Sequence, residues 1–492
     1  MILNQLPILQ VVLPLLAAPL CLLLKNSTWA TWLTAVTSWL TFFVAVFLLQ
    51  QTLEIGSQSY SIGGWTPPWG IEYRIDALNA FVLLFVSAIC AIVATASGPS
   101  VIREIGRDRA YLFYCCFLLF ETGLLGVVAT GDVFNLFVFL EISSLAAYVL
   151  VSFGRDRRAL SAAYRYLILG TIGATFYLIG VGLLYQATGT LNFSDLATRM
   201  PLLEDSRTIR AAFAFITVGI ALKLALFPLH LWLPNAYAYA PSIVTALLAG
   251  TATKVALYIL LRIFFTLFGS NFSFGTLPVD VIIMPLAVAA VFVGSAAAIF
   301  ENDVKRMLAY STIAQIGYMV IGISLATVTG LTGGIVHMFN HAVIKTALFL
   351  SLACAVWRVG PVTMDAIAGL GKRMPLTMGA FVLAGMSLIG VPGTAGFVSK
   401  WYLVTAALER GWWWIALVMV VGSLLSIVYI WRVLEAAYFR PVSEGAPTGE
   451  APLLMLLPTW TLVATTLYFG VDTRFGVGMA RLAAESLLGL VP

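Results

Sequence analysis

The chain has 492 residues, of which 61% are hydrophobic and only 10% are charged. Soluble globular domains carry about 25% charged residues, so this composition excludes a water-soluble protein and predicts an integral membrane protein. The net charge of +5 comes from basic residues in short connecting segments that form no basic patch or tail, and we therefore expect no binding to nucleic acid.

Sequence motifs for disulfides, metals and nucleotides are missing. The five cysteines lie in apolar stretches without a CxxC motif, so neither a disulfide framework nor a zinc or iron–sulfur site is expected. The sequence around GLGKRMP at 369–375 is no Walker A loop, and there is no dinucleotide fingerprint. We therefore expect no cofactor and no enzyme chemistry of its own, with energy supplied by an ion gradient or a partner subunit. The first residues lack the features of a cleaved signal peptide and are expected to begin the first span.

A helix needs about 20 apolar residues to cross a bilayer core of about 30 Å. By this rule the sequence predicts an all-α integral membrane protein, a single membrane domain over 1–492. About fourteen spans are predicted, in chain order at 5–24, 29–50, 76–98, 108–128, 131–152, 160–186, 209–231, 242–264, 280–300, 307–326, 331–357, 376–408, 411–434 and 451–470. Pro228 and Pro234 lie near the end of the seventh span, and VPGTAG at 391–396 interrupts the twelfth. Proline removes a backbone donor and clashes with the preceding turn, so broken helices are predicted there.

Lysine and arginine are unevenly distributed among the predicted loops. With the N-terminus outside, the inner loops hold 15 basic residues and the outer segments hold 8. Because cytoplasmic loops carry the excess of positive charge, both termini are predicted to lie outside.

Ionisable side chains also fall inside the apolar spans. A charge at the bilayer centre costs about 2.5–3.5 kcal/mol, so these groups must face one another or a wetted interior. For any single residue a structural ion pair explains the burial equally well. Four lysines, however, outnumber two carboxylates, and burial with mutual repulsion favours neutral lysine, so the set is better interpreted as a chain of titratable sites. Its members are Lys223, Lys254, Lys345, Lys400, Glu121, Glu141, His230, His337 and His341.

The eleventh span carries three of these residues on one helical face. His337, His341 and Lys345 are spaced i, i+4 and i+8 and cover about 12 Å of membrane depth. Histidine titrates near neutrality and passes protons through either ring nitrogen. A metal-binding HxxxH pair and two hydrogen-bonded core histidines are the alternatives. No cysteine or carboxylate lies close in sequence and Lys345 would repel a cation, so a proton relay is preferred.

The two predicted breaks lie next to lysines. Lys223 precedes Pro228 by five residues, and Lys400 follows Gly396 by four. Non-helical backbone at membrane depth is tolerated only beside protein or a water-filled cavity. Two lysines at two breaks indicate a duplicated unit of five helices, and inverted repeats of this kind are typical of transporters.

Several segments in a fixed order carry a resemblance to a known family over about residues 75–440. The chain resembles the proton-translocating, antiporter-like membrane subunits of Mrp-type multisubunit cation/proton antiporters, respiratory complex I and membrane-bound hydrogenases. Within that family it is most similar to the D subunit of the Mrp Na+/H+ antiporters. The segments are GDVFNLFVFLEISSLAAYVLV (131–151), SAAYRYLILG (161–170), ALKLALFPLHLWLPNAY (221–237), APSIVTALLAGTATKVALY (240–258), KRMLAYSTIAQIGY (305–318), HMFNHAVIKTALFL (337–350) and GVPGTAGFVSKW (390–401).

The resemblance implies fourteen helices, with spans 4–8 and 9–13 as inverted repeats at 108–264 and 280–434. It implies that the family's glutamate–lysine pair gates proton entry, that central relay positions follow, and that a lysine on the other half-channel exchanges the proton last. It also implies other membrane subunits as partners, protons and Na+ as the transported ions, and the cell (inner or plasma) membrane as the location. These roles fall on Glu141 with Lys223, on Lys254 and His341 with His337 and Lys345 nearby, and on Lys400. Glu121 matches no functional position.

Two other functions stay open at this point. The same proton path suits a proton-pumping subunit of a complex I-like NADH–quinone oxidoreductase or a membrane-bound hydrogenase, which is part of an enzyme assembly. A stand-alone solute carrier could use the broken helices to bind a small substrate. The first alternative is not separated from an antiporter by any residue of this chain, because neither needs cofactor ligands here.

Overall fold

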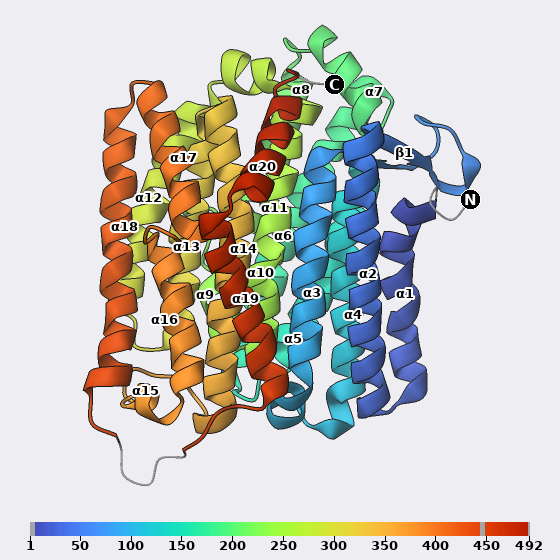
Figure 1. Ribbon diagram of the computed structural model, residues 1–492. Coiled ribbons are helices and arrows are strands. Elements are labelled where there is room, and N and C mark those ends of the chain that lie inside the picture. Colours follow the sequence, from blue (N-terminus) through green and yellow to red (C-terminus); the bar gives the residue numbers. More distant parts are fainter. Residues whose placement is uncertain (1–4, 443–447, 491–492) are drawn as a thin grey trace.

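Helices make up most of the chain in the computed structural model, which describes residues 5–442 and 448–490 (Figure 1). Of the helices in these residues, 12 are long and apolar enough to cross a membrane. The prediction of an all-helical membrane protein is therefore confirmed. The longer helices are α1 (Leu6–Leu24), α2 (Ser27–Ile55), α3 (Ala77–Glu104), α4 (Ala110–Ala129), α5 (Val133–Ser152), α6 (Arg158–Thr188), α8 (Arg207–Leu224), α12 (Val279–Phe300), α13 (Val304–Ser324), α14 (Val328–Val359), α16 (Pro375–Ile389), α17 (Ala395–Glu409), α18 (Trp413–Leu434) and α19 (Leu453–Val471).

Shorter elements connect or extend these helices. Five are short α-helices, one is a C-terminal helix, and the rest are short segments of tighter or wider helix. They are α7 (Phe193–Arg199), α9 (Leu233–Tyr239), α10 (Ser242–Gly250), α11 (Ala252–Leu261), α15 (Leu370–Arg373), α20 (Arg474–Leu487), η2 (Ile62–Gly64), η3 (Arg107–Arg109), η4 (Met200–Leu202), η5 (Arg262–Leu267), η6 (Asn271–Thr276) and η7 (Glu435–Phe439).

Each predicted span corresponds to one helix or to two helices separated by a break. The two predicted spans outside the set of 12 are 209–231 and 376–408, for which broken helices were predicted. In Figure 1 the C-terminal end of the chain lies at the upper face, and α1 begins at the right in the upper half of the molecule.

The breaks have identifiable backbone causes. In the first, between α8 and α9, Ala225 has φ +60°, a left-handed conformation that is uncommon for residues with a side chain. Pro228, farther along the same interruption, has no N–H to continue the helix. In the second, α16 ends at Gly390 with φ +91°, where glycine is favoured because it has no Cβ. A third break, which was not predicted, separates α10 from α11 at Thr251.

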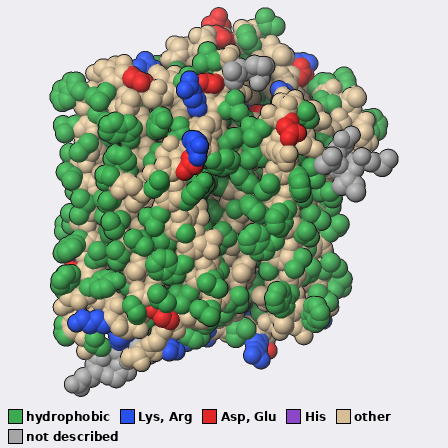
Figure 2. Space-filling view, in the orientation of Figure 1, with side chains coloured by type: hydrophobic (Ala, Val, Ile, Leu, Met, Phe, Trp, Pro, Cys, Tyr) green, Lys and Arg blue, Asp and Glu red, His purple; other side chains and the backbone are tan. Residues whose placement is uncertain are grey.

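The outer surface is apolar around its middle. In Figure 2 the Lys, Arg, Asp and Glu side chains lie mostly near the upper and lower edges of the molecule, with a broad hydrophobic area between them. Large apolar side chains such as Leu16, Trp32 and Trp431 are exposed. A contiguous exposed apolar surface of this extent is typical of contact with lipid. The chain is a multi-pass integral membrane protein.

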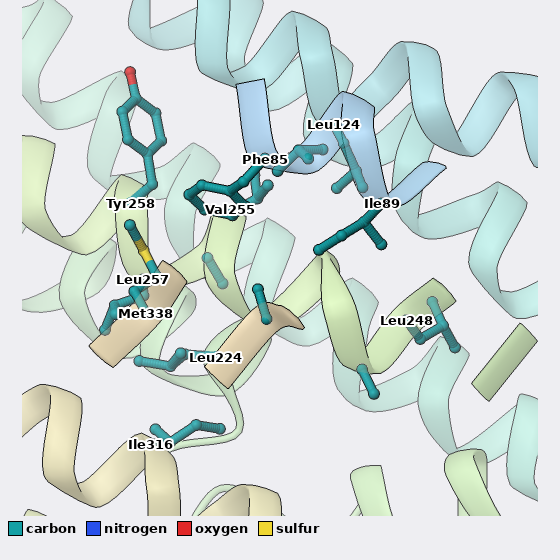
Figure 3. Packing of buried hydrophobic residues seen from close by; sticks show 14 of the residues in the cluster. Phe85, Ile89, Leu124, Leu224, Leu248, Val255, Leu257, Tyr258, Ile316 and Met338 are labelled. Carbon is teal, nitrogen blue, oxygen red and sulfur yellow. The ribbon is translucent and has the colours of Figure 1, made fainter. Parts of the chain in front are cut away.

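Helix α14 lies at the centre of the bundle. It packs against α10, α13, α16, α17, α19 and α20, and its residues from Gly330 to Ala355 are all buried. Figure 3 shows part of the surrounding core, where Leu224, Leu257 and Met338 come from α8, α11 and α14. Polar side chains on α14 are therefore kept away from lipid.

Two elements were not predicted from the sequence. Strands β1 (Gln58–Ser61) and β2 (Glu72–Ile75) form an antiparallel hairpin between α2 and α3. Helix α20 buries residues every three or four positions, which is the spacing of an amphipathic helix, and it packs on α3 and α14. Its polar side interrupts the apolar run by which a membrane span is recognised.

Two connections share the same local structure. Asp132 precedes α5, caps it and pairs antiparallel with Asn192. Asp303 precedes α13, caps it and pairs in the same way with Thr363. Both residues of the second pair follow their counterparts by 171 positions. Because an odd number of spans separates the two connections, they lie on opposite faces of the bundle.

Candidate functional site

Glu141 and Lys223 form a largely buried ion pair between α5 and α8. Lys223 Nζ lies 3.2 Å from Glu141 Oε1, donates to Ser144 Oγ at 2.8 Å, and lies 3.4 Å from Tyr148 OH. The Lys223 side chain is only 6% exposed, compared with 22% for Glu141. One carboxylate and two hydroxyls thus compensate for the loss of water around the ammonium group.

The local structure holds Lys223 at the end of α8, next to the break. Trp232 Nε1 donates to the carbonyl oxygen of Leu222 at 2.9 Å, which ties the far end of the interruption to the helix end. The Trp232 ring stacks on Tyr166 with centroids 4.0 Å apart, and Tyr166 packs edge-on against Tyr148 at 4.6 Å. This series of aromatic contacts positions the groups around the ammonium.

A small cavity lies beside the ion pair. Its volume is about 30 Å³, and Lys223, Ser144, Ala252 and Val255 are among its lining residues. A space of this size holds a water molecule when polar partners are present, and Lys223 and Ser144 supply them. Since Ala252 and Val255 belong to α11, the cavity leads from the ion pair toward the helix that carries Lys254.

Lys254 is buried at the third break. It lies in the first turn of α11, is 1% exposed, and its Nζ donates to the carbonyl oxygen of Ala249 in the last turn of α10. Thr253 Oγ1 lies 3.3 Å away. The ammonium group is therefore held by oxygen atoms at the junction of two helices and not by a carboxylate.

The two histidines of α14 have different surroundings. His337 Nδ1 lies 2.8 Å from Ser399 Oγ, and its Nε2 lies 3.0 Å from Gln315 Oε1. The ring of His341 is nearly parallel to that of His337, with centroids 5.9 Å apart. His341 is 1% exposed, and neither ring nitrogen has a partner among the described residues. Buried ring nitrogens are normally hydrogen-bonded, so water is expected beside His341.

Lys345 extends the same helix face by two turns beyond His337. Its Nζ donates to the carbonyl oxygen of Leu308 at 2.7 Å and to Ser311 Oγ at 2.5 Å, both on α13. The side chain is completely buried. His337 and Lys345 thus both contact α13.

Lys400 lies early in α17, after the second break. Its Nζ donates to the carbonyl oxygens of Leu388 and Ile389, at 3.1 and 2.9 Å, which end α16. It also lies over the ring of Tyr318, 5.1 Å from the centroid. Like Lys254, it occupies the end of an interrupted helix.

The helices that carry these groups are neighbours. Helices α8, α11, α14 and α17, which carry the lysines, pack in that order. Of the four lysines, only Lys223 is paired with a carboxylate within the described part of the chain. The line of ionisable side chains from Glu141 to Lys400 therefore has a carboxylate at one end, and its other basic groups are not paired with a carboxylate of the described residues.

Two ionisable residues of the apolar spans lie apart from this line. Glu121 on α4 lies at hydrogen-bond distance from the Ser38 and Thr41 hydroxyls of α2. His230 lies in the interruption after α8 and stacks on Phe227, with centroids 5.3 Å apart.

The described residues contain no group of three or more His, Cys, Asp or Glu side chains that could hold a metal ion. Both ring nitrogens of His337 are occupied by Ser399 and Gln315. The local contacts of His337 therefore do not favour a metal-binding HxxxH pair with His341.

The family model described as "NADH:quinone oxidoreductase/Mrp antiporter, TM" matches residues 130–426. This range is more than half of the chain and contains the whole line from Glu141 to Lys400. The chain belongs to this family. The resemblance found in the sequence is confirmed.

Members of both branches of the family are similar to this chain. The NADH-quinone oxidoreductase subunit N of Desulforudis audaxviator is 45% identical over 406 residues, which cover 82% of this chain and 80% of that protein. The D subunit of the Na(+)/H(+) antiporter of Alkalihalophilus pseudofirmus is 30% identical over 428 residues, with coverages of 87% and 85%. A chain in the structure of the Mrp complex from Dietzia sp. aligns with a TM-score of 0.90 and 26% identity, over 100% of this chain and 98% of that one.

For this family member, sequence reasoning missed the partners that hold the basic groups. Ser144 follows Glu141 by three residues, and Ser311 and Gln315 are four residues apart, so each set shares a helix face. Polar residues on a common face of an apolar span were a usable signal. The backbone carbonyls at the breaks had no such signal, because they depend on where each helix ends.

Proposed function

We propose that this chain is the proton-translocating subunit of a multisubunit monovalent cation (Na+)/H+ antiporter. The observation that carries the proposal is the buried line of ionisable side chains from the Glu141–Lys223 pair to Lys400. We place the protein in the cell (plasma) membrane with both termini outside. The family and the Na(+)/H(+) antiporter relative support this function, and the distribution of basic residues supports the orientation.

The line has a two-part architecture in this proposal. Residues 108–264 and 280–434 are two inverted five-helix repeats, each with a broken helix and one of the lysines beside it. The matched connections at Asp132 and Asp303, on opposite faces of the bundle, support this division. Each repeat then supplies half of a proton path, and the halves meet at α14.

The first step is gating by the ion pair. While Lys223 contacts Glu141, its positive charge is compensated. When the pair separates, the uncompensated charge repels a proton on the next group, Lys254. At about 8 Å and an effective dielectric constant of about 20, two unit charges interact by about 2 kcal/mol. An energy of this size is enough to bias the direction of proton transfer. The cavity between Lys223 and α11 is suited to a water that carries the proton across.

The middle of the proton path uses both lysine and histidine side chains. A proton released by Lys254 reaches His341 through water, binds one ring nitrogen and leaves from the other. His337 and Lys345 lie on the same helix face and adjust the charge around it. The oxygen partners of each lysine accept hydrogen bonds from charged ammonium and neutral amine alike, so a lysine can lose a proton without losing all its contacts.

Lys400 is the last exchanger in this scheme, and protons leave from it toward the opposite face. The coupled movement of Na+ takes place in the assembly of this chain with other membrane subunits. The relatives are named as subunits, which supports a role within a larger complex. This chain is an ion-translocating membrane subunit whose own residues perform no redox chemistry in the proposal.

A second function is favoured by a specific observation. The NADH-quinone oxidoreductase subunit N is more nearly identical to this chain than the antiporter relative is, at 45% against 30%. The alternative is therefore a proton-pumping membrane subunit of a complex I-like oxidoreductase or a membrane-bound hydrogenase. The proton line would be the same, and the driving force would come from electron transfer in other subunits.

Reconstitution of the intact complex separates the two functions. The complex is purified with all its subunits, inserted into proteoliposomes with a pH-sensitive dye inside, and exposed first to Na+ and then to electron donors. Proton flux that follows Na+ supports the antiporter, and flux that needs an electron donor supports the alternative. Glu141→Gln should abolish either flux, whereas Glu54→Gln, at the exposed end of α2, should leave it unchanged. Normal flux with Glu141→Gln would overturn both proposals.

A further inference from the structure

Glu121 is a buried carboxyl group that the proton line does not use. It is fully buried on α4, where Ser38 Oγ donates to its Oε2 at 2.6 Å and Thr41 Oγ1 lies 2.8 Å from its Oε1. Helix α4 turns Gly123 toward Ser143 of α5, whereas Glu121 is turned toward α2. The helix itself therefore stands between Glu121 and the helix that carries the ion pair.

The number of hydrogens indicates which form of Glu121 fits this geometry. Thr41 Oγ1 lies 2.8 Å from Glu121 Oε1 and also 2.8 Å from the backbone oxygen of Ser38. A hydroxyl has one hydrogen to donate. With an ionised carboxylate, two hydroxyl hydrogens must serve three short oxygen–oxygen contacts, and one contact lacks a hydrogen.

A protonated carboxyl group supplies the missing hydrogen. Glu121 then donates from Oε1 to Thr41 Oγ1, Thr41 donates to the Ser38 carbonyl, and the Ser38 hydroxyl donates to Oε2. Each of the three short contacts now contains one hydrogen, and every group donates once. The geometry around Glu121 is thus that of a neutral acid.

The charges on the surrounding helices agree with a neutral acid. Within the described residues, α1, α2 and α4 contain no Lys, Arg or His, and α3 has only Arg103, in its last turn. A carboxylate without a cation in an apolar interior costs far more free energy than a hydrogen-bonded acid. Helices α5 and α11 also pack on α4, on which Glu121 lies. The ionisable groups on these helices are Cys21 on α1, Glu54 on α2, Cys90, Arg103 and Glu104 on α3, Tyr111, Tyr114, Cys115 and Cys116 on α4, Glu141 and Tyr148 on α5, and Lys254 and Tyr258 on α11.

A row of hydroxyl groups leads from the membrane face to Glu121. We call it the hydroxyl track. Its members are spaced four, three, four and three positions apart, so they share one face of α2. They span about 21 Å at 1.5 Å per residue, and their burial increases toward Glu121. The hydroxyl track consists of Ser27, Thr31, Thr34, Ser38 and Thr41.

The track ends at the acid. Beyond Thr41 the same face continues with Ala45 and Leu48, which are apolar and fully buried. In the other direction, the Tyr114 hydroxyl and Ser97 Oγ, 2.9 Å apart on α4 and α3, add polar groups two turns before Glu121. Along α2, the polar groups of the described residues therefore reach Glu121 from the end where the helix begins.

Thr34, in the middle of the track, has a hydroxyl group without a protein partner among the described residues. Its Oγ1 is fully buried, and the Cys21 thiol, a weak donor and acceptor, is a neighbour. No described residue lies at hydrogen-bond distance and geometry from this hydroxyl. A buried hydroxyl in that situation is normally satisfied by an ordered water, which would link neighbouring hydroxyls of the track.

We propose that Glu121 is a second proton-binding site, which exchanges its proton along the hydroxyl track with the membrane face where α2 begins. The site is a dead end, separate from the line between Glu141 and Lys400. Its ligand is a proton alone, delivered and removed through hydroxyl groups and water. The site stands independently of the function proposed above, because it uses neither the ion pair nor the lysines.

Infrared difference spectroscopy of the purified complex tests the binding site. A protonated carboxyl group has a carbonyl stretching band that an ionised one lacks, and the band shifts when the acid hydrogen is replaced by deuterium. The band of Glu121 should be present at neutral pH, vanish in Glu121→Gln and persist in Glu141→Gln. An identical spectrum in wild type and Glu121→Gln at every pH would overturn the proposal.

The rate of the deuterium shift after transfer to D2O tests the track. Thr34→Val removes one hydroxyl without removing a hydrogen bond to another described residue, so it should leave the fold intact. It should slow the shift by about tenfold or more, because a relay that lacks one hydrogen-bonding group has a higher barrier. The control is Thr122→Val, whose hydroxyl is bonded to Leu118 of its own helix. Equal rates in wild type and Thr34→Val would rule out the track as the route.

Transport assays keep this inference separate from the proposed function. Because the site is a dead end, Glu121→Gln should retain proton flux in proteoliposomes, while Glu141→Gln should not. Loss of flux in Glu121→Gln with a correctly assembled complex would place Glu121 on the transport line and overturn the dead-end assignment. Flux retained in both variants would contradict the proposed function and leave the infrared result on Glu121 unaffected.

Discussion

Lys400 Nζ lies 2.9 Å from the carbonyl oxygen of Ile389, across the break between α16 and α17. The last carbonyls of a helix have no donor within that helix and carry its partial negative charge. Lys400 therefore satisfies the end of α16 and finds there a stabilising environment for its own charge. Neutral lysine keeps two N–H groups, so it can still bond Leu388 and Ile389 after giving up a proton.

Replacing Lys400 should reduce transport and leave the complex assembled. Lys400→Ala removes the proton carrier and leaves two carbonyls for water to satisfy. We expect proton flux in proteoliposomes to fall to background, with all subunits still co-purifying. Lys400→Arg keeps the charge and the hydrogen bonds but does not release a proton near neutral pH, so it should be equally inactive. Substantial flux with arginine would show that only the charge matters.

The ion pair should behave as a unit. Glu141→Gln and Lys223→Gln each leave one member without its partner, and the double variant leaves neither charge. We expect both single variants to lose flux, and the Lys223 ammonium left alone to lower thermal stability by about 1–3 kcal/mol. The double variant should recover part of this stability, which a thermal unfolding series of the three complexes measures. Additive losses would mean that the two side chains do not interact.

Replacing Ser311 should lower stability and proton flux more than replacing other buried serines. Its hydroxyl lies 2.5 Å from Lys345 Nζ, so Ser311→Ala leaves the lysine with the Leu308 carbonyl alone. We expect a destabilisation of about 1–3 kcal/mol and slower proton flux. Ser351→Ala is the matched control, because that hydroxyl bonds only the Ala347 carbonyl of its own helix. The prediction is wrong if both variants have the same melting temperature and flux.

Close packing of α4 on α5 should be needed to position Glu141. A Cβ at Gly123 would overlap the backbone nitrogen of Ser143, two residues beyond Glu141. Gly123→Ala should therefore push the helices apart, destabilise the protein by about 1–3 kcal/mol and reduce flux. At Gly182 nothing lies within 4 Å of the added atom. Gly182→Ala should be neutral or stabilising because alanine favours the helix, and a thermal-shift assay compares the two.

Sequence patterns predicted the spans and two of the three breaks, for clear physical reasons. Apolar runs long enough to cross a bilayer are strong signals, and Pro228 and the VPGTAG segment break a helix whatever surrounds them. The third break, at Thr251, carried only one preceding glycine, which is tolerated within helices. Helix α20 has one polar and one apolar face, so its sequence contains no continuous apolar run that would predict a span.

The candidate site was predicted as a set of residues and not as a set of contacts. Burial of Lys254 or Lys345 in an apolar span follows from local sequence, and the grouping of roles came from the family resemblance. Tertiary packing decides the rest. It brings Ser38 and Thr41 to Glu121 from about 80 positions away, and it leaves both ring nitrogens of His341 without a side-chain partner among the described residues. Nothing local in the sequence encodes such neighbours.

The interruption after α8 is braced at both ends, by the Trp232 bond to Leu222 and by the stack of Trp232 on Tyr166. These two contacts of Trp232 favour a backbone that keeps its position during transport. Large movement of α8 against α6 would have to separate the Trp232 indole from the Tyr166 ring in every cycle. Protons then pass through this chain by rotation of side chains and rearrangement of water, while the helices stay in place. Cross-linking α8 to α6 through engineered cysteines should therefore leave turnover intact.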